Sequence, residues 1–453
     1  MPCRRLSRPA LAGALLAALG LSLAMPAVVQ AAEALPPDNV THVPWSRQAV
    51  IYEVNLRQYT PQGTIQAFSA HLPRLKAMGV DILWLMPVHP IGIKQRKGTL
   101  GSYYAVRDYQ AVNPEFGEMA DLRDLVQQAH LLGMKVILDW VANHTAWDHP
   151  WVSQHRDWYK KNAKGEVYPV TFGEGEHKEE WTDVVALDYT QPGLRQAMIE
   201  AMSFWVREVD VDGFRCDVAG LVPMPFWRDA RKALDKIKPV FMLAEWDAPV
   251  MHDGAFDMTY DLGLYDVFKA VAKGNAGKSV LVDFLKQPTQ AYPADAYRMR
   301  YTANHDSNSW QASDAEAFGP SLQAFAVLAA TLPGMPLLYG GQEGGLDKRL
   351  KFFEKDPIAW KNYPLGDFYT ALFRLKQEHP ALVNGALGGP LQIVELGHPT
   401  LFAFQRTRDE DQVTVVVNLS PSPQSLSGHP VLGELTLDGW GWRITTKDGA
   451  KLP

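Results

Sequence analysis

An arginine and an aspartate stand two residues apart in the segment GFRCDVAG, residues 213–220, among apolar neighbours. If this segment is a strand, the side chains of Arg215 and Asp217 point to the same face. One interpretation is a structural ion pair. The other is chemical, because a guanidinium favours the ionised form of a neighbouring carboxyl group and so keeps it able to attack a substrate.

Polar side chains also close other apolar runs of the chain. They are Asp139, Asn143 and His144 in KVILDWVANH (135–144), Glu245 and Trp246 in VFMLAEW (240–246), and His305 and Asp306 in RMRYTANHD (298–306). Carboxyl groups at the ends of several buried strands are costly to desolvate. Their recurrence therefore favours a functional site over a set of separate structural ion pairs.

Two of these carboxyl groups have the surroundings that cleavage of a glycosidic bond requires. In that reaction one carboxylate attacks the anomeric carbon, while a second carboxyl group keeps its proton for the leaving oxygen. Arg215 favours an ionised Asp217, and Ala244 and Trp246 offer Glu245 apolar surroundings that raise the pKa of a carboxyl group. The pattern predicts Asp217 as the nucleophile and Glu245 as the acid.

Eight apolar runs, with helical stretches between many of them, must position these side chains. They span 49–59, 79–88, 135–144, 211–220, 240–246, 256–261, 298–306 and 335–343. Most are apolar on both faces, which is typical of a parallel sheet covered by helices. Eight such runs predict an α/β fold, a (β/α)8 TIM barrel, in which active sites lie at the carboxyl ends of the strands.

Two segments depart from the barrel pattern. A short polar insertion at about 145–182 follows the third strand. From about 391, segments in which apolar and polar residues alternate are separated by turns rich in Gly, Pro and Asp. We therefore expect a catalytic barrel over 32–384 and a small antiparallel β-sandwich over 385–453. We also expect Gly79, Gly133 and Gly213 to cap the helices that precede three strands.

Four short blocks together resemble the α-amylase family, glycoside hydrolase family 13. They are DWVANH (139–144), GFRCD (213–217), AEW (244–246) and NHD (304–306), in the order and spacing of that family. The resemblance covers nearly all of the chain after its N-terminal segment. It implies a retaining mechanism on α-glucosidic bonds, with Asp217 as nucleophile and Glu245 as acid and base.

The resemblance also implies roles for the remaining candidates. Asp306 would hold hydroxyl groups of the sugar at the cleavage point, Arg215 would orient Asp217, and His144 and His305 would donate hydrogen bonds to that sugar. Tyr104, in GSYYAVRDY (101–109), would stack under the sugar ring, with Asp108 beneath its loop. Asp139 and Asn143 would support the site, and Trp246 is either core or a wall of the substrate cleft.

Three departures from the family pattern bear on metal and substrate. Ala186 and Leu221 stand where family members often carry an acid and a histidine that help to bind structural calcium. Because Ca²⁺ takes six or more oxygen ligands, we expect no calcium at this place and no other metal or cofactor. Ala219 and Gly220 stand where a lysine often grips the leaving-group side of the substrate, which weakens the case for a typical starch endo-amylase.

The first residues are typical of an export signal. Arg4, Arg5 and Arg8 precede an apolar run and a small-residue site, so we expect a signal peptide over 1–31 and a periplasmic or secreted protein without stable membrane insertion. Its removal leaves 41 basic against 50 acidic residues, which excludes nucleic acid as an expected partner. Cys216 is then the one remaining cysteine, so no intrachain disulfide forms.

The predicted function is hydrolysis of α-glucosidic, mainly α-1,4, bonds in maltooligosaccharides or starch-like glucans. A transglycosylase is the first alternative, because the same covalent intermediate serves both reactions and only the access of water or of a sugar acceptor differs. A catalytically inactive sugar-binding barrel is the second. Retention of Asp217, Glu245 and Asp306 together argues against it.

Overall fold

A computed structural model describes residues 40–173, 178–286, 292–447, 449 and 451–452 of the protein. The expected signal peptide, residues 1–31, and Cys3 within it lie outside the described residues. Among the helices that are described, none is long and apolar enough to cross a membrane.

Eight parallel strands close into a barrel in the order β1-β11-β10-β9-β8-β7-β3-β2. The strands are β1 Ile51–Val54, β2 Ile82–Leu85, β3 Lys135–Trp140, β7 Gly213–Cys216, β8 Phe241–Ala244, β9 Met258–Tyr260, β10 Tyr297–Arg300 and β11 Met335–Tyr339. Each comes from one of the eight apolar runs, and nearly all their residues are buried. The predicted fold class is confirmed, since strands that are apolar on both faces require helices outside and packed side chains within.

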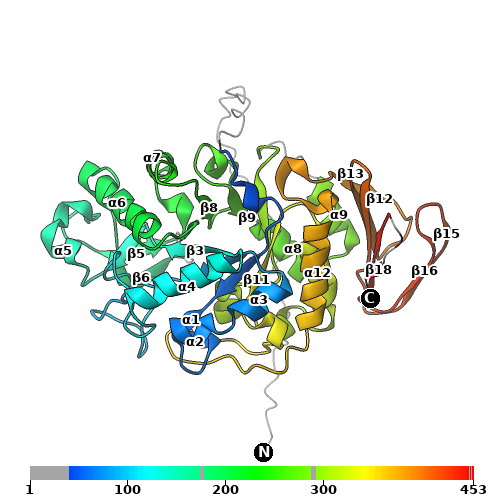
Figure 1. The fold of residues 1–453 in the computed structure, drawn as a ribbon, viewed down its shortest axis with the longest axis horizontal. Coiled ribbons are helices and arrows are strands. Elements are labelled where there is room, and N and C mark those ends of the chain that lie inside the picture. The colour runs from blue at the N-terminus through cyan, green and yellow to red at the C-terminus, as the bar shows by residue number, and fades with distance from the viewer. Residues whose placement is uncertain (1–39, 174–177, 287–291, 448, 450, 453) are drawn as a thin grey trace, which may run out of the picture. The chain divides into compact units, whose positions relative to one another are not determined.

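Helices surround the barrel, as Figure 1 shows for α3, α4 and α12. The helices are α1 Leu56–Tyr59, α2 Ile65–Ser69, α3 Leu72–Met78, α4 Met119–Leu131, α6 Pro192–Glu208, α7 Met224–Asp235, α8 Leu262–Ala272, α9 Lys278–Lys286, α10 Asp314–Ala317, α11 Leu322–Thr331 and α12 Gly366–Glu378. α4 begins with a reciprocal cap between Glu118 and Asp121, which satisfies two backbone N–H groups that have no partner within the helix.

Two of the three glycines before strands act as expected, and one does not. Gly79 ends α3 with a φ of +97°, and Gly133 follows α4 with a φ of +74°. Gly213 lies inside β7, and the left-handed residue after α6 is Asp210, with a φ of +61°. The prediction of a helix cap at Gly213 was wrong. A Cβ there would lie 1.9 Å from the carbonyl oxygen of Phe241, so close strand approach requires the glycine.

The polar insertion forms a small antiparallel sheet after β3. Its strands are β4 His144–Ala146, β5 Pro169–Phe172 and β6 Glu179–Ala186 in the order β4-β6-β5, and α5 Pro150–Gln154 lies between β4 and β5. In Figure 1 this sheet lies on the opposite side of the barrel from the chain's last strands. Because β4 starts at His144, the insertion begins at the rim where the candidate residues of β3 end.

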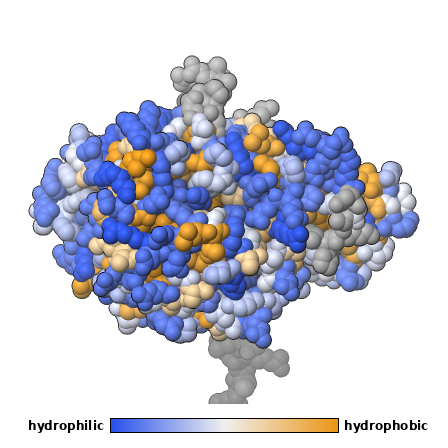
Figure 2. Space-filling model, viewed as in Figure 1, coloured by the Kyte–Doolittle hydropathy of each residue, from blue (hydrophilic) through white to orange (hydrophobic). Residues whose placement is uncertain are grey.

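The tail forms two antiparallel sheets. β12 Leu391–Val394, β13 Leu401–Arg408, β14 Asp411–Asn418, β17 Trp442–Thr446 and β18 Lys451–Leu452 make the larger sheet, and β15 Gln424–His429 and β16 Gly433–Leu437 make the smaller one. Alternate residues of β13 pack in opposite directions: Phe402 and Phe404 join the main core, while Leu401 and Ala403 join a second cluster with Leu435. Figure 2 shows the molecular face as mostly polar, with apolar side chains in separate groups.

Candidate active site

The candidate carboxyl groups meet at the carboxyl ends of the barrel strands. Asp139 lies in β3, Asp217 directly follows β7, Glu245 directly follows β8, and Asp306 lies six residues beyond the end of β10. Arg215 in β7 pairs in register with Asp139 in β3, so their side chains point to the same face of adjacent strands. Strand order and register thus assemble a site from four separate parts of the chain.

The guanidinium of Arg215 joins three of these carboxyl groups. Its Nη1 donates to Asp139 Oδ1 at 2.9 Å and to Asp217 Oδ1 at 3.1 Å. Its Nη2 lies 2.9 Å from Glu245 Oε1, in an ion pair whose angle is not that of a hydrogen bond. A single buried cation therefore fixes the two carboxyl groups predicted to do the chemistry relative to each other.

Aromatic rings and buried negative charge hold this cation in place. The guanidinium carbon lies 5.0 Å from the ring centre of Trp84 and 5.7 Å from those of Tyr104 and Tyr260. Burial lowers the pKa of Arg215, but Asp139 and Glu245 outweigh it and raise that pKa well above its ordinary value. Arg215 therefore carries a positive charge at neutral pH.

Exposure separates the carboxyl groups into two sets. The side chain of Asp306 is 40% exposed, that of Glu245 19% and that of Asp217 11%, whereas those of Asp139 and Glu53 are fully buried. A substrate at the rim can reach the first three only. Asp139 can act only through its neighbours, by accepting hydrogen bonds from Arg215 and Tyr104.

The surroundings of Glu245 differ from the expected apolar pocket. Besides the ion pair with Arg215, its Oε2 accepts a hydrogen bond of 2.7 Å from the backbone N–H of Val218. Val218 has a φ of +36° and a ψ of +47°, the left-handed region that a β-branched residue rarely adopts. The backbone after Asp217 is thus held in a strained turn that aims an N–H group at Glu245.

Burial still favours the neutral forms of Asp217 and Glu245. Desolvation and the charge of Glu245 raise the pKa of Asp217 well above its ordinary value, against the opposing effect of Arg215. Desolvation likewise raises the pKa of Glu245, again against Arg215, and Asp306 adds to the rise. One cation cannot neutralise several buried carboxylates, so the pair retains a proton more readily than free carboxylates do.

His305 is held as a cation by carboxylates on two sides. Its Nδ1 donates to Glu53 Oε1 at 2.5 Å, and its Nε2 lies 2.7 Å from the hydroxyl of Tyr104 and 3.3 Å from Asp306 Oδ2. Burial lowers its pKa, but Asp306 and Glu53 raise it to about 9 overall. Sequence reasoning missed Glu53, although a lone carboxylate inside the apolar run AVIYEVNL was a usable signal.

The hydroxyl group of Tyr104 links His305 to Asp139 through hydrogen bonds. Its hydroxyl donates to Asp139 Oδ2 at 3.0 Å, and its ring stacks near His305 with centres 5.5 Å apart. Asp108, expected beneath this loop, is exposed and accepts a hydrogen bond from the backbone N–H of Gln110. The structure therefore brings Tyr104 into the site and leaves Asp108 outside it.

His144 and Asn143 close the site on the side of the inserted sheet. Burial lowers the pKa of His144 to about 4, so its ring is neutral. Its Nδ1 lies 3.1 Å from the side-chain nitrogen of Asn143, which donates to it, and its ring meets the edge of Trp181 at 5.7 Å. His144 and His305 thus lie at the same rim in different charge states, His144 neutral and His305 positive.

Comparison with known proteins fits this geometry. The family model of the α-amylase catalytic domain matches residues 38–363, which include all eight barrel strands. The chain belongs to the α-amylase family. It is 28% identical over 400 residues to α-amylase MalA of Haloarcula japonica, covering 84% of this chain and 57% of that protein.

Two further family members show the range of these relatives. A crystal structure of an α-amylase from Lactobacillus plantarum superposes with a TM-score of 0.78 at 30% identity, over 89% of this chain and 99% of that one. An α-1,4-glucan:maltose-1-phosphate maltosyltransferase of Rhodospirillum rubrum is 31% identical over 303 residues, 62% of this chain and 42% of its own length. The chain therefore spans about half the length of these curated relatives.

The loop after β7 carries Gly220 where the family pattern often has a lysine. A Cβ at this position would lie 2.1 Å from the indole of Trp246, so the indole packs against the bare backbone. Trp246 is partly buried and directly follows Glu245. A lysine at position 220 would displace this indole, which gives a physical reason for the glycine.

The residues at the family's calcium position do not fit a calcium ion. The side-chain nitrogen of Asn143 donates to His144, and its backbone carbonyl accepts from Leu187 N–H at 3.0 Å. Ala186 and Leu221 supply no side-chain oxygen. Nor do the described residues hold any group of three or more His, Cys, Asp or Glu side chains arranged for a metal ion.

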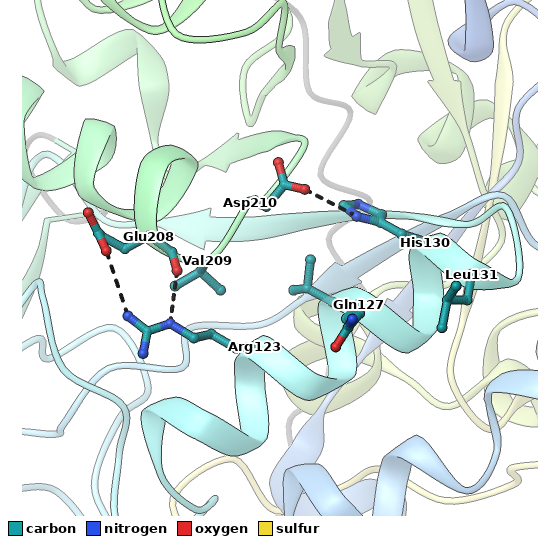
Figure 3. A pocket seen from close by; sticks show the side chains of 8 residues that line it. Arg123, Gln127, His130, Leu131, Glu208, Val209 and Asp210 are labelled. Carbon is teal, nitrogen blue, oxygen red and sulfur yellow. Dashed lines mark hydrogen bonds and ion pairs between the residues drawn. The ribbon is translucent and has the colours of Figure 1, made fainter.

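A surface pocket elsewhere on the barrel lies apart from the cluster of candidate carboxyl groups. It lies between α4 and the end of α6 and is lined by Arg123, Val126, Gln127, His130, Leu131, Glu208, Val209 and Asp210. Figure 3 shows Arg123 paired with Glu208 and His130 paired with Asp210. α4 and α6 end here just before β3 and β7 begin, so the pocket lies by the amino ends of the strands, opposite the carboxyl cluster.

Proposed function

We propose that the protein cleaves α-glucosidic, mainly α-1,4, bonds in maltooligosaccharides or starch-like glucans and retains the anomeric configuration. The observation that carries the proposal is the guanidinium of Arg215, which joins Asp217 and Glu245 at the ends of adjacent strands. Both carboxyl groups are partly exposed at the rim, where a glycosidic bond can lie between them. Paired carboxyl groups in this position are the machinery of glycoside cleavage.

In the first step, the carboxylate of Asp217 attacks the anomeric carbon. The bond from that carbon to the leaving oxygen breaks, and Glu245 gives its proton to this oxygen. Buried negative charge favours retention of the proton within the pair, and Arg215 stabilises the remaining negative charge. The leaving sugar departs with a free hydroxyl group, and a glucosyl ester on Asp217 remains.

In the second step, the oxygen of a water molecule attacks the anomeric carbon while Glu245 takes a proton from that water. The ester bond to Asp217 breaks, and both carboxyl groups return to their starting states with one water consumed. A sugar hydroxyl in place of water would give transfer instead. The maltosyltransferase among the relatives makes transfer the second candidate function.

The remaining side chains position the sugar at the cleavage point. Asp306, the most exposed carboxylate of the cluster, accepts hydrogen bonds from its hydroxyl groups. His305, a cation in the segment after β10, and neutral His144 in β4 flank the ring from separate parts of the chain. Tyr104 offers its face to the ring, with its hydroxyl held by Asp139 and His305.

The test is a time course of products from maltoheptaose in ¹⁸O-labelled water, followed by mass spectrometry. We expect labelled short products from the wild type. Asp217→Asn and Glu245→Gln should each lower the rate by about 10²–10⁴-fold or more. Asp108→Asn, an equivalent change at an exposed carboxylate outside the cluster, should leave the rate unchanged.

Three results of this experiment would change or overturn the proposed function. Unlabelled products longer than maltoheptaose mean transfer. Equal rates for Asp217→Asn and the wild type overturn the assignment of the nucleophile. No change in maltoheptaose or any other α-glucan overturns the enzyme proposal and favours a sugar-binding barrel.

We also propose that the protein is exported to the periplasm or medium after cleavage near Ala31. The support is the arginine-rich start, the apolar run and the small residues that follow it. N-terminal sequencing of protein from fractionated cells tests this proposal. A mature chain that begins with Met1 in the cytosolic fraction would contradict it.

A further inference from the structure

Three aromatic side chains beside the site have no part in the reaction steps above. Trp310 is 51% exposed, and Phe352 and Phe353 are partly exposed. We propose that these three side chains form a platform, continuous with Tyr104, on which further glucose rings of an α-glucan stack beyond the ring at the cleavage point. This inference rests on the proposed function and adds to it the direction in which the substrate extends.

The platform is continuous with the site. The rings of Tyr104 and Phe352 lie nearly parallel, with an angle of 12° and centres 6.2 Å apart. The ring of Phe352 lies 4.9 Å from that of Trp310, which lies 5.7 Å from that of Phe353. Ring contacts therefore form an unbroken series from Tyr104, which is hydrogen-bonded to His305 and Asp139, to the exposed Trp310.

Hydrogen bonds fix the two segments that carry the platform. Trp310 lies in the π-helical turn Ser307–Gln311 (η7), which directly follows Asp306. Four hydrogen bonds join the turn to the segment 348–350. Asn308 Nδ2 donates to Lys348 O at 3.1 Å, and Leu350 N donates to Asn308 Oδ1 at 2.9 Å. Arg349 donates to Ser309 O from Nη2 at 2.7 Å and from Nε at 3.3 Å. The relative position of Trp310 and Phe352 is thus set before any ligand arrives.

The segment of the two phenylalanines is fixed from its other side as well. The side-chain amide of Gln58 donates to the carbonyls of Lys351 and Glu354 at 2.9 and 2.7 Å. The backbone N–H of Leu100 donates to Phe353 O at 3.1 Å. A rigid, preformed surface loses little conformational entropy on binding.

Chemistry identifies a sugar chain as the occupant. A glucose ring has apolar C–H groups on its faces and hydroxyl groups around its edge, so it can cover an indole and still remain hydrated. An exposed tryptophan has no such cover in the free protein, and π-helical turns occur often at functional sites. Because the platform begins at Tyr104, its occupant is the next part of the molecule that occupies the cleavage point.

Binding to an inactive enzyme tests the platform. In Glu245→Gln, calorimetry would measure the Kd of glucose and of maltoheptaose, with and without Trp310→Ala. We expect Trp310→Ala to raise the Kd of maltoheptaose about fivefold to tenfold and that of glucose, which occupies the cleavage point alone, less than about twofold. Trp310→Phe should recover most of the affinity, and Leu131→Ala, an exposed apolar residue by the pocket of Figure 3, should change neither value.

The outcomes separate this inference from the proposed function. An equal loss of affinity for both sugars, or no loss for either, overturns the platform while the proposed function stands. A Trp310→Ala variant that turns an oligomer into a monomer in gel filtration also overturns it, because the patch is then a contact between copies. Failure of the parent protein to bind or cleave any α-glucan overturns the proposed function itself.

Discussion

The buried pair of His305 and Glu53 predicts a specific dependence of stability on pH. His305 has an ordinary pKa of 6.5, which Asp306 and Glu53 raise to about 9 despite the opposing effect of burial. Its raised pKa stabilises the folded state fully below pH 6.5, and this stabilisation is lost as the pH rises through 9. The rise corresponds to about 3 kcal/mol of unfolding free energy.

Glu53→Gln removes the charge but keeps the shape of the side chain. Because Asp306 also supports the cation, we expect the variant to lose about 2 kcal/mol of this pH-dependent stabilisation. Urea denaturation at pH 6.5, 8 and 9.5 would measure the free energy of unfolding of the wild type and the variant. The gap between them should be largest at pH 6.5 and should narrow steadily towards pH 9.5.

A gap that stays constant over this range would refute the reasoning, because it would show that Glu53 does not raise the pKa of His305. Asp108→Asn serves as the control, since it also removes one carboxylate but at an exposed position. Its stability should track that of the wild type at all three pH values, with a difference within about 0.5 kcal/mol.

Three further predictions follow from the site and its strands. Gly213→Ala should lower the free energy of unfolding by about 3 kcal/mol or more, because its Cβ would overlap the neighbouring strand; a smaller loss in urea denaturation would contradict the close approach. Since Ala186 and Leu221 offer no oxygen ligands, a chelator should leave activity and Tm unchanged, and a fall in Tm would reveal a metal site. Gly220→Ala should displace the indole of Trp246, and an unchanged tryptophan emission spectrum would show that it does not.

The barrel could be predicted because burial on both faces leaves a strong pattern in sequence. Each of the eight strands lies in or overlaps an apolar run, and polar residues such as Asp139, Glu245 and Asp306 stand near or beyond the carboxyl ends of the strands. The carboxyl ends of the strands in a barrel lie at one rim, so predicting the barrel also predicts that these residues lie close together.

The contacts across the barrel could not be predicted in the same way. Glu53 and His305 are 252 residues apart, and only the closure of the barrel brings β1 near the end of β10. The reach of Arg215 to Glu245 likewise depends on which strands are neighbours. Sequence reasoning paired Arg215 with Asp217 alone and predicted apolar surroundings for Glu245. In the structure, Arg215 pairs with both Asp217 and Glu245.

Local backbone conformation was the other source of error. Nothing in the letters GFRCDVAG signals that Val218 adopts a left-handed conformation and turns its N–H group towards Glu245. Gly213 was misread because a glycine before a strand serves either as a helix cap or as a point of close approach. Only the position of Phe241 on the adjacent strand decides between them.

The measurement that tests the central claim most directly is rescue of two variants by azide, with an α-glucosyl fluoride as substrate. In Asp217→Ala, azide should attack the substrate in place of the missing carboxylate and give a β-glucosyl azide. In Glu245→Ala, azide should attack the glucosyl ester on Asp217 and give the α-glucosyl azide. NMR of the products showing these two opposite configurations would support both assigned roles, and the reverse assignment, or one configuration from both variants, would contradict them.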